Sequence, residues 1–103
     1  MAQTWRIIIE ENKPSTTQGV HLTIHPATFH HEWEAENEAK RLAEEYKPGS
    51  LMTHRERTIL RRGKGEYKVL VQGMVGNTHF QVTVYEVVSG APTGSHFANK
   101  ALR

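Results

Sequence analysis

Residues 28–49 read TFHHEWEAENEAKRLAEEYKPG, and this stretch fixes the one helix around which the rest of the chain is arranged. Its small and apolar residues recur at spacings of three and four, which places one stripe on a helix face: Ala35, Ala39, Leu42, Ala43 and Tyr46. Thr28 is expected to cap its beginning, and Pro48 followed by Gly49 is expected to end it. The stretch therefore predicts a helix over 29–46 with one face turned toward a core.

Alternating apolar residues on both sides of this helix predict β-strands. Five runs alternate in this way: 4–10, 20–25, 51–61, 67–72 and 79–88. The first two flank a polar loop and predict a hairpin, while the last three are separated by Gly-containing turns and predict a meander. One helix cannot cover both faces of five strands, so the expected fold class is α+β, with two layers, one helix on a mostly antiparallel five-stranded sheet, in the order ββαβββ. Residues 1–88 are expected to form this single domain, and 89–103 a loosely structured C-terminal tail.

Strand periodicity also predicts which side chains share a face. The face under the helix is expected to carry Trp5, Ile7, Ile9, Leu22, Ile24, Val69, Val71, Phe80, Val82 and Val84. The opposite face is expected to be basic and to carry Arg6, Ile8, His21, Thr23, His25, Arg55, Arg57, Ile59, Arg61, Lys68, Leu70, Gln72, His79, Gln81, Thr83 and Tyr85. For the strand over 51–61 a reversed facing or a bulge stays open, because the set left for the helix side makes a poor core face: Met52, His54, Glu56, Thr58 and Leu60.

Composition excludes several classes of protein. The chain has 103 residues, a net charge of +2 and no cysteine, so disulfides, thiolate metal sites and cysteine nucleophiles are excluded. All eleven acids are glutamate, and no nucleophile elbow, P-loop or dinucleotide fingerprint occurs. No apolar run approaches the roughly 18 residues of a membrane span. We therefore expect a cytoplasmic protein, either in a bacterial host cell or in a cell infected by a virus, that is not an enzyme, has no membrane partner and carries no catalytic residue.

Charge is distributed in two poles that the small net charge hides. Residues 53–68 hold six cations against two acids, whereas 28–47 hold six glutamates against three cations. Charge poles of this kind steer binding partners. The residues expected to contact a partner are the cations Arg55, Arg57, Arg61, Arg62, Lys64 and Lys68, with Trp33 as a second contact and Tyr85 among the cations of the sheet face.

Three other interpretations of these features stay open. The same basic face is typical of surfaces that follow phosphates and stack bases, which would make the chain a nucleic-acid-binding module. It could equally be a solvated sheet whose cations protect edge strands from aggregation. A homodimer could instead form through a seam of Ile8, Ile59, Leu70 and Tyr85, with the arginines at its rim.

Seven histidines raise the question of a metal site. His21 and His25 are four residues apart on one predicted strand, about 13 Å, which is too far to share a metal directly. His30 and His31 are adjacent on the predicted helix and point about 100° apart. No His-Glu-x-x-His motif occurs. A histidine-based metal-binding protein is therefore the weaker alternative, with no metal ligands assigned and no cofactor expected.

The segment 23–26, Thr-Ile-His-Pro, followed by 36–49, ENEAKRLAEEYKPG, resembles a pattern in small α+β proteins encoded by phages and prophages. In those proteins a hairpin runs into a helix that ends in a similar run and Pro-Gly. The resemblance covers about 30 residues and implies a mobile-element origin. It also implies that the chain is similar to accessory proteins that bind host machinery. These include inhibitors of bacterial defence such as anti-CRISPR proteins. The expected function is therefore a non-enzymatic binding protein that occludes a host protein or nucleoprotein complex.

Overall fold

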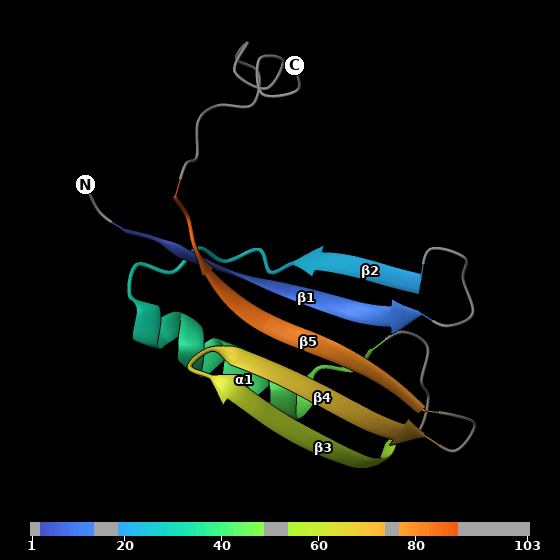
Figure 1. Ribbon diagram of the computed structural model, residues 1–103. Coiled ribbons are helices and arrows are strands. Elements are labelled where there is room, and N and C mark those ends of the chain that lie inside the picture. Colours follow the sequence, from blue (N-terminus) through green and yellow to red (C-terminus); the bar gives the residue numbers. More distant parts are fainter. Residues whose placement is uncertain (1–2, 14–18, 49–53, 74–76, 89–103) are drawn as a thin grey trace, which may run out of the picture.

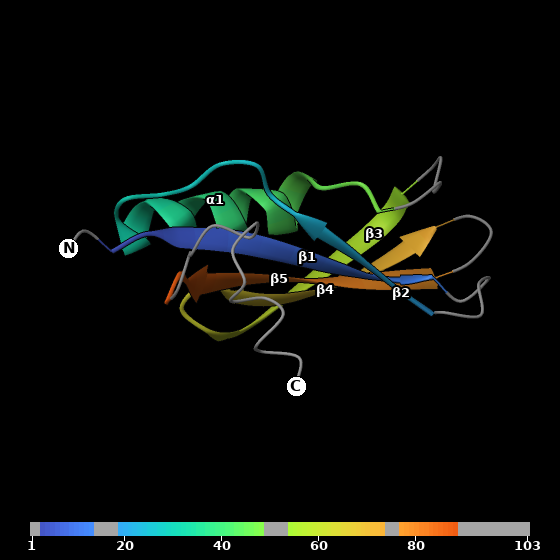
Figure 2. The ribbon, with the colours of Figure 1, turned by 90° about the horizontal axis from the view of Figure 1, so that it is seen from above.

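Strand pairing builds one antiparallel sheet from two ends of the chain. The structure, a computed structural model, describes residues 3–13, 19–48, 54–73 and 77–88. Its elements follow the expected order ββαβββ: β1 (Trp5–Lys13), β2 (Gly19–Ile24), α1 (Glu32–Glu45), β3 (His54–Gly63), β4 (Glu66–Gly73) and β5 (Asn77–Glu86). The sheet order is β2-β1-β5-β4-β3, because β5 returns to pair with β1 (Figure 1). Figure 2 shows α1 on one side of this sheet, which confirms the two-layer α+β fold.

The core lies between α1 and the central strands. Its buried side chains are Ile7, Ile9, Ala39, Leu42, Ala43, Val69, Val71, Phe80 and Val82. Alanines on the helix stripe let α1 approach the sheet closely, and α1 contacts β5, β4, β1 and β3. The core strands and the helix stripe therefore agree with the periodicity of the sequence.

The helix begins later than expected, at Glu32 rather than at 29. Phe29 pairs instead with Trp5 through two backbone hydrogen bonds of 2.8 and 2.9 Å, so this residue is extended. The N-cap is His31, whose side chain makes no capping hydrogen bond, and the expected cap at Thr28 is wrong. Residues 29–31 are therefore not helical, because Phe29 pairs with β1 instead. This pairing holds the start of α1 beside the start of β1.

The expected facing of β2 is wrong. Ile9 of the core pairs with Thr23, which puts Thr23 on the helix side, and Leu22 and Ile24 on the other face, 60% and 57% exposed. Because β2 is an edge strand that α1 does not cover, its helix side needs no large apolar residues. His25, just beyond the strand, also lies toward the helix and hydrogen-bonds Glu38 at 3.0 Å.

The expected facing of β3 is wrong as well, and the register explains why. Arg57 pairs with buried Val71, Ile59 with Val69 and Arg61 with Tyr67, so these three residues lie on the helix side: Arg57, Ile59 and Arg61. The pairing shifts between His54 and Glu56 and again between Arg61 and Gly63. Such bulges add a residue to one strand and reset its alternation.

The other face of the sheet is not covered by any described element, and we call it the open face (Figure 2). The strand registers assign it these residues: Arg6, Ile8, Glu10, Asn12, Leu22, Ile24, Glu56, Thr58, Leu60, Glu66, Lys68, Leu70, Gln72, Asn77, His79, Gln81, Thr83 and Tyr85. Its charged side chains are Arg6 and Lys68 against three glutamates. The basic sheet face expected from the sequence is therefore wrong, because the arginines of β3 lie on the helix side.

One carboxylate is buried at the edge of the core. Glu11 is 5% exposed on the helix side of β1, and the hydroxyl of Tyr46 donates a hydrogen bond to it. Tyr46 follows the last residue of α1, so this bond ties the end of the helix to the sheet. Burial, together with that carboxylate, raises the pKa of Tyr46 to about 12.

This raised pKa predicts a loss of stability at high pH. The pKa of Tyr46 in the unfolded chain is 10.0, so the stabilisation from its neutral phenol is complete below that pH and is lost as pH rises through about 12. Urea unfolding of the wild type and of Tyr46→Phe between pH 8 and pH 12 measures this. We expect a stability advantage of the wild type that shrinks over the window, and a constant difference would contradict the assignment.

The one helix among the described residues, α1, has 14 residues and carries charges along its length. No helix in the described part of the chain is long and apolar enough to cross a membrane.

Candidate binding surface at the hairpin tip

The turn between β3 and β4 is held rigidly against β5. It consists of Lys64 and Gly65, and the carbonyl of Gly65 accepts a 2.9 Å hydrogen bond from the backbone N–H of Val84. Gly65 has a φ of 72°, and a Cβ there would stand 2.9 Å from a methyl group of Val84. Glycine is thus required both by the left-handed backbone and by the close approach. The side chain of Lys64 therefore projects from a fixed point.

Lys64 and Trp33 line one hollow, which we call the hairpin-tip hollow. It is an open depression of about 550 Å³, and its walls come from the start of β1, the start of α1 and the hairpin turn: Gln3, Trp5, His30, His31, Glu32, Trp33, Glu36 and Lys64. Trp33 is 59% exposed, and its ring stacks on His31 with 6.1 Å between centroids. Two residues expected separately as partner contacts thus belong to the same surface.

Two local features assemble this hollow. The backbone bridge between Trp5 and Phe29 brings the residues before α1 next to β1. The Gly65 turn then brings Lys64 toward the first half of the helix, where Glu36 lies close to the turn. Trp5 was expected in the core, and it is a half-buried wall of the hollow instead. Alternation alone could not distinguish these positions, because Trp5 keeps the strand period of Ile7 and Ile9.

The remaining cations of the hairpin point in different directions. Arg61 lies on the helix side of β3, Arg62 sits in the bulge, and Lys68 lies on the open face. All three are exposed, and within the described part of the chain no ion pair involves them or Lys64. These four cations are therefore exposed on one hairpin, but they do not form a single basic patch. The structure does not describe the side chain of Arg55.

Arg57 differs from the other cations because it serves the fold. Its Nη1 donates to the carbonyl of Ala43 at 2.8 Å, and its Nη2 donates to the carbonyl of Tyr46 at 2.7 Å. Its guanidinium carbon lies 5.7 Å from the centroid of the Phe80 ring. Burial lowers the pKa of Arg57. The last turn of α1 carries no cation of its own, so Arg57 supplies the positive charge that the helix C-terminus favours.

The acidic pole on α1 is partly neutralised within the chain. Arg41 donates hydrogen bonds to Glu38 at 2.9 and 2.6 Å and to Glu45 at 3.0 Å. These bonds, above all the one from Arg41, keep the pKa of Glu38 below its usual value, and His25 contributes. The first turn of α1 carries two acids, Glu32 and Glu34. Glu32 lines the hollow, and so does Glu36 from the second turn. The hollow thus presents both signs of charge beside two tryptophans.

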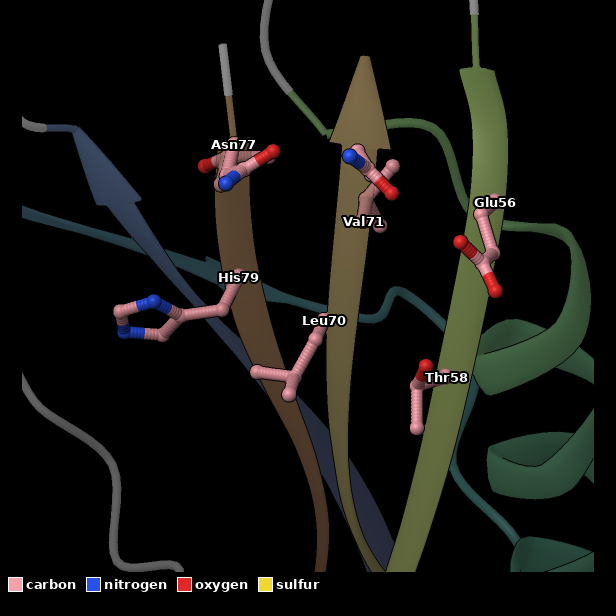
Figure 3. A pocket seen from close by; sticks show the side chains of 8 residues that line it. Glu56, Thr58, Leu70, Val71, Asn77 and His79 are labelled. Carbon is pink, nitrogen blue, oxygen red and sulfur yellow. The ribbon is translucent and has the colours of Figure 1, made fainter.

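Tyr85 lies on the other face of the sheet from the hairpin-tip hollow. It is 46% exposed on the open face and pairs across the strands with Arg6. The open face also has a shallow hollow of about 420 Å³ near the far end of β4, with Glu56, Thr58, Leu70 and His79 in its wall. Figure 3 shows Leu70 and His79 side by side on neighbouring strands. The structure therefore does not bring Tyr85 together with Trp33.

The histidines do not converge in the described residues. His30 and His31 line the hairpin-tip hollow, whereas His25 bonds Glu38 and His79 lies on the open face. In the part of the chain that is described, no three histidine, cysteine, aspartate or glutamate side chains are grouped closely enough to hold a metal ion.

No family model, curated protein or solved structure matches the chain. The candidate site therefore depends on the geometry of the described residues alone.

Proposed function

We propose that the chain is a non-enzymatic binding protein whose hairpin-tip hollow contacts a host macromolecule. By binding there, the chain occludes a surface that the macromolecule needs. The observation that supports this is the meeting of Trp33 and Lys64, 31 positions apart in sequence, at one exposed hollow. Tryptophan and arginine are the residue types that dominate binding energy at protein interfaces. Here the hollow holds the exposed Trp33, and Arg61 and Arg62 are exposed on the same hairpin as Lys64.

A protein segment suits this surface better than a nucleic acid does. Glu32 and Glu36 line the hollow and would repel a phosphate backbone that ran through it. A protein segment can place a carboxylate against Lys64 and an apolar side chain against Trp33. The resemblance of residues 23–49 to prophage proteins supports a bacterial defence complex as the kind of target, which would make the chain an inhibitor of the anti-CRISPR type.

The test is a quantitative capture experiment. Tagged wild-type protein is used to capture partners from a lysate of the bacterial host, and the captured macromolecule is then titrated with each purified variant. We expect Trp33→Ala to weaken binding about 30-fold or more, as the loss of an interface anchor does. Lys64→Ala should weaken it less. Lys40→Ala is the matched control, because Lys40 is exposed on the same helix but lies outside the hollow.

A salt series distinguishes the direct nucleic-acid alternative. Labelled single-stranded and double-stranded DNA and RNA are titrated with the wild type and with Arg61→Ala. Phosphate binding would weaken steeply with salt, and the variant would lower the slope by about one. If the wild type binds a nucleic acid tightly with this salt dependence, and Trp33→Ala binds it with the same affinity, the proposal is overturned. The chain would then be a nucleic-acid-binding module.

A further inference from the structure

One row across the open face has a charge pattern that is complementary to itself. The registers align five open-face residues in one row across the sheet, one per strand: Leu22, Glu10, Gln81, Lys68 and Leu60. Gln81 is at the centre, with a charge of opposite sign on each side of it and a leucine at each margin. Glu10, Lys68 and Gln81 also line one small hollow of about 180 Å³. In the part of the chain described, no ion pair engages Glu10 or Lys68.

We propose that a second copy of the chain covers the open face, in a homodimer whose twofold axis runs along β5. Rotation about this axis places β1 of one copy over β4 of the other, and β2 over β3. Glu10 of each copy then faces Lys68 of the other copy, and Leu22 of each copy faces Leu60 of the other. A twofold axis perpendicular to the strands would instead place Glu10 over Glu10 and Lys68 over Lys68, so charge selects the axis along β5.

Residues on a twofold axis meet their own copies, and β5 suits this position. Its open-face side chains are Asn77, His79, Gln81, Thr83 and Tyr85, and none of them is a glutamate, lysine or arginine. An amide, a hydroxyl and a phenol can each hydrogen-bond a copy of itself. The charged residues stand only on the other strands, and the rotation brings one pair of opposite sign together, Glu10 with Lys68. The other charged residues of the open face lie near strand ends: Arg6, Glu56 and Glu66. Arg6 donates a hydrogen bond to the carbonyl of His25, and Glu66 would lie over Ile8.

The size of the open face fits a stable dimer. Strands about 4.8 Å apart that overlap for roughly eight residues give a face of roughly 24 by 26 Å. This projected area is close to the roughly 800 Å² per partner of a standard interface, once side-chain relief is included. Apolar residues of the open face are exposed in one copy, with Leu22, Ile24, Leu60, Leu70 and Tyr85 each 42–60% exposed. Two such sheets would pack face to face, each with its helix outside, as in other sheet-on-sheet packings.

The experiment is a measurement of mass in solution by sedimentation equilibrium, with a charge swap. We expect the wild type to be a dimer, and we expect Lys68→Glu and Glu10→Lys each to raise the dissociation constant about tenfold or more, since each puts like charges opposite one another. The double variant Glu10→Lys/Lys68→Glu should restore the dimer. Lys40→Glu makes the same charge change on the exposed side of α1 and should leave the mass unchanged. A monomeric wild type at high concentration, or a double variant that stays monomeric while folded, would overturn the proposal.

A cross-link locates the axis independently. The chain has no cysteine, so Gln81→Cys and Asn37→Cys each carry a single thiol. Packed sheets lie about 10 Å apart, beyond the reach of a disulfide, so a short bis-maleimide is the reagent. We expect a cross-linked dimer from position 81, on the axis, and none from position 37, on the outer side of the helix. Equal cross-linking at the two positions would contradict the proposed axis.

Discussion

Arg57→Ala is expected to lower the free energy of unfolding by about 2–3 kcal/mol, because it removes charge-assisted hydrogen bonds and leaves buried acceptors unpaired. Arg57 bonds the carbonyls of Ala43 and Tyr46, which belong to the C-terminal end of α1. Carbonyls at a helix end have no partner within the helix. The variant should therefore loosen the contact between the helix and β3, and urea unfolding followed by circular dichroism measures the effect.

The control separates a structural arginine from a binding arginine. Arg61, four residues along the same strand, is exposed, and Arg61→Ala should change the stability by no more than about 0.5 kcal/mol. Arg57→Lys keeps the charge, but its ammonium group cannot bond both carbonyls in the fork geometry of a guanidinium. Its loss of stability should therefore lie between those of Arg57→Ala and Arg61→Ala. If Arg57→Ala unfolds at the same urea concentration as the wild type and only loses its partner, the partner-binding role expected from the sequence is correct.

The sequence predicted the elements of the fold because their periods are strong. The stripe through Ala39 and Ala43 and the alternation around Val69 and Val82 are properties of single segments, which local geometry determines. What the sequence could not determine was which side of an edge strand faces the helix. In β2 the apolar side chains alternate with His21 and Thr23, and the more polar set faces the helix because α1 does not extend over that strand.

Bulges limited the prediction of β3 in the same way. A single extra residue reverses every side chain beyond it, and the registers shift near both ends of this strand. The sequence left a bulge or a reversed facing open for this strand, but nothing in 54–63 marks the position of the shift between His54 and Glu56. As a result Arg57, counted in sequence among the free cations of the hairpin, is turned toward the helix in the structure.

The candidate site was predictable in parts and not as a whole. The cations of the hairpin and Trp33 were identified separately, from charge and from residue type. Their meeting at one hollow depends on the bridge between Trp5 and Phe29 and on the left-handed turn at Gly65. The turn itself was predicted from its glycines, but the Trp5–Phe29 bridge and the bond from Val84 to Gly65 join distant segments, which no local pattern in the sequence encodes.

The second prediction with a large effect concerns Phe80, which supports the end of the helix from below. Phe80 is fully buried and meets the ring of Tyr46 edge to face, with 5.1 Å between centroids. Phe80→Ala should destabilise the chain by about 3–5 kcal/mol through lost burial and the cavity left behind. Single domains have a total stability of about 5–15 kcal/mol, so the variant should be unfolded or close to unfolding at 37 °C.

Phe80→Leu tests what the ring adds beyond its volume. Leucine keeps most of the apolar volume, so this variant should lose less than about 1.5 kcal/mol from packing. It also removes the aromatic face below the guanidinium of Arg57, 5.7 Å away, a contact worth about 0.5–1 kcal/mol. Combining Phe80→Leu with Arg57→Met should therefore cost less than the sum of the two single changes, by about that amount. Strict additivity in this cycle would show that the Phe80 ring adds nothing to the way Arg57 holds the helix end.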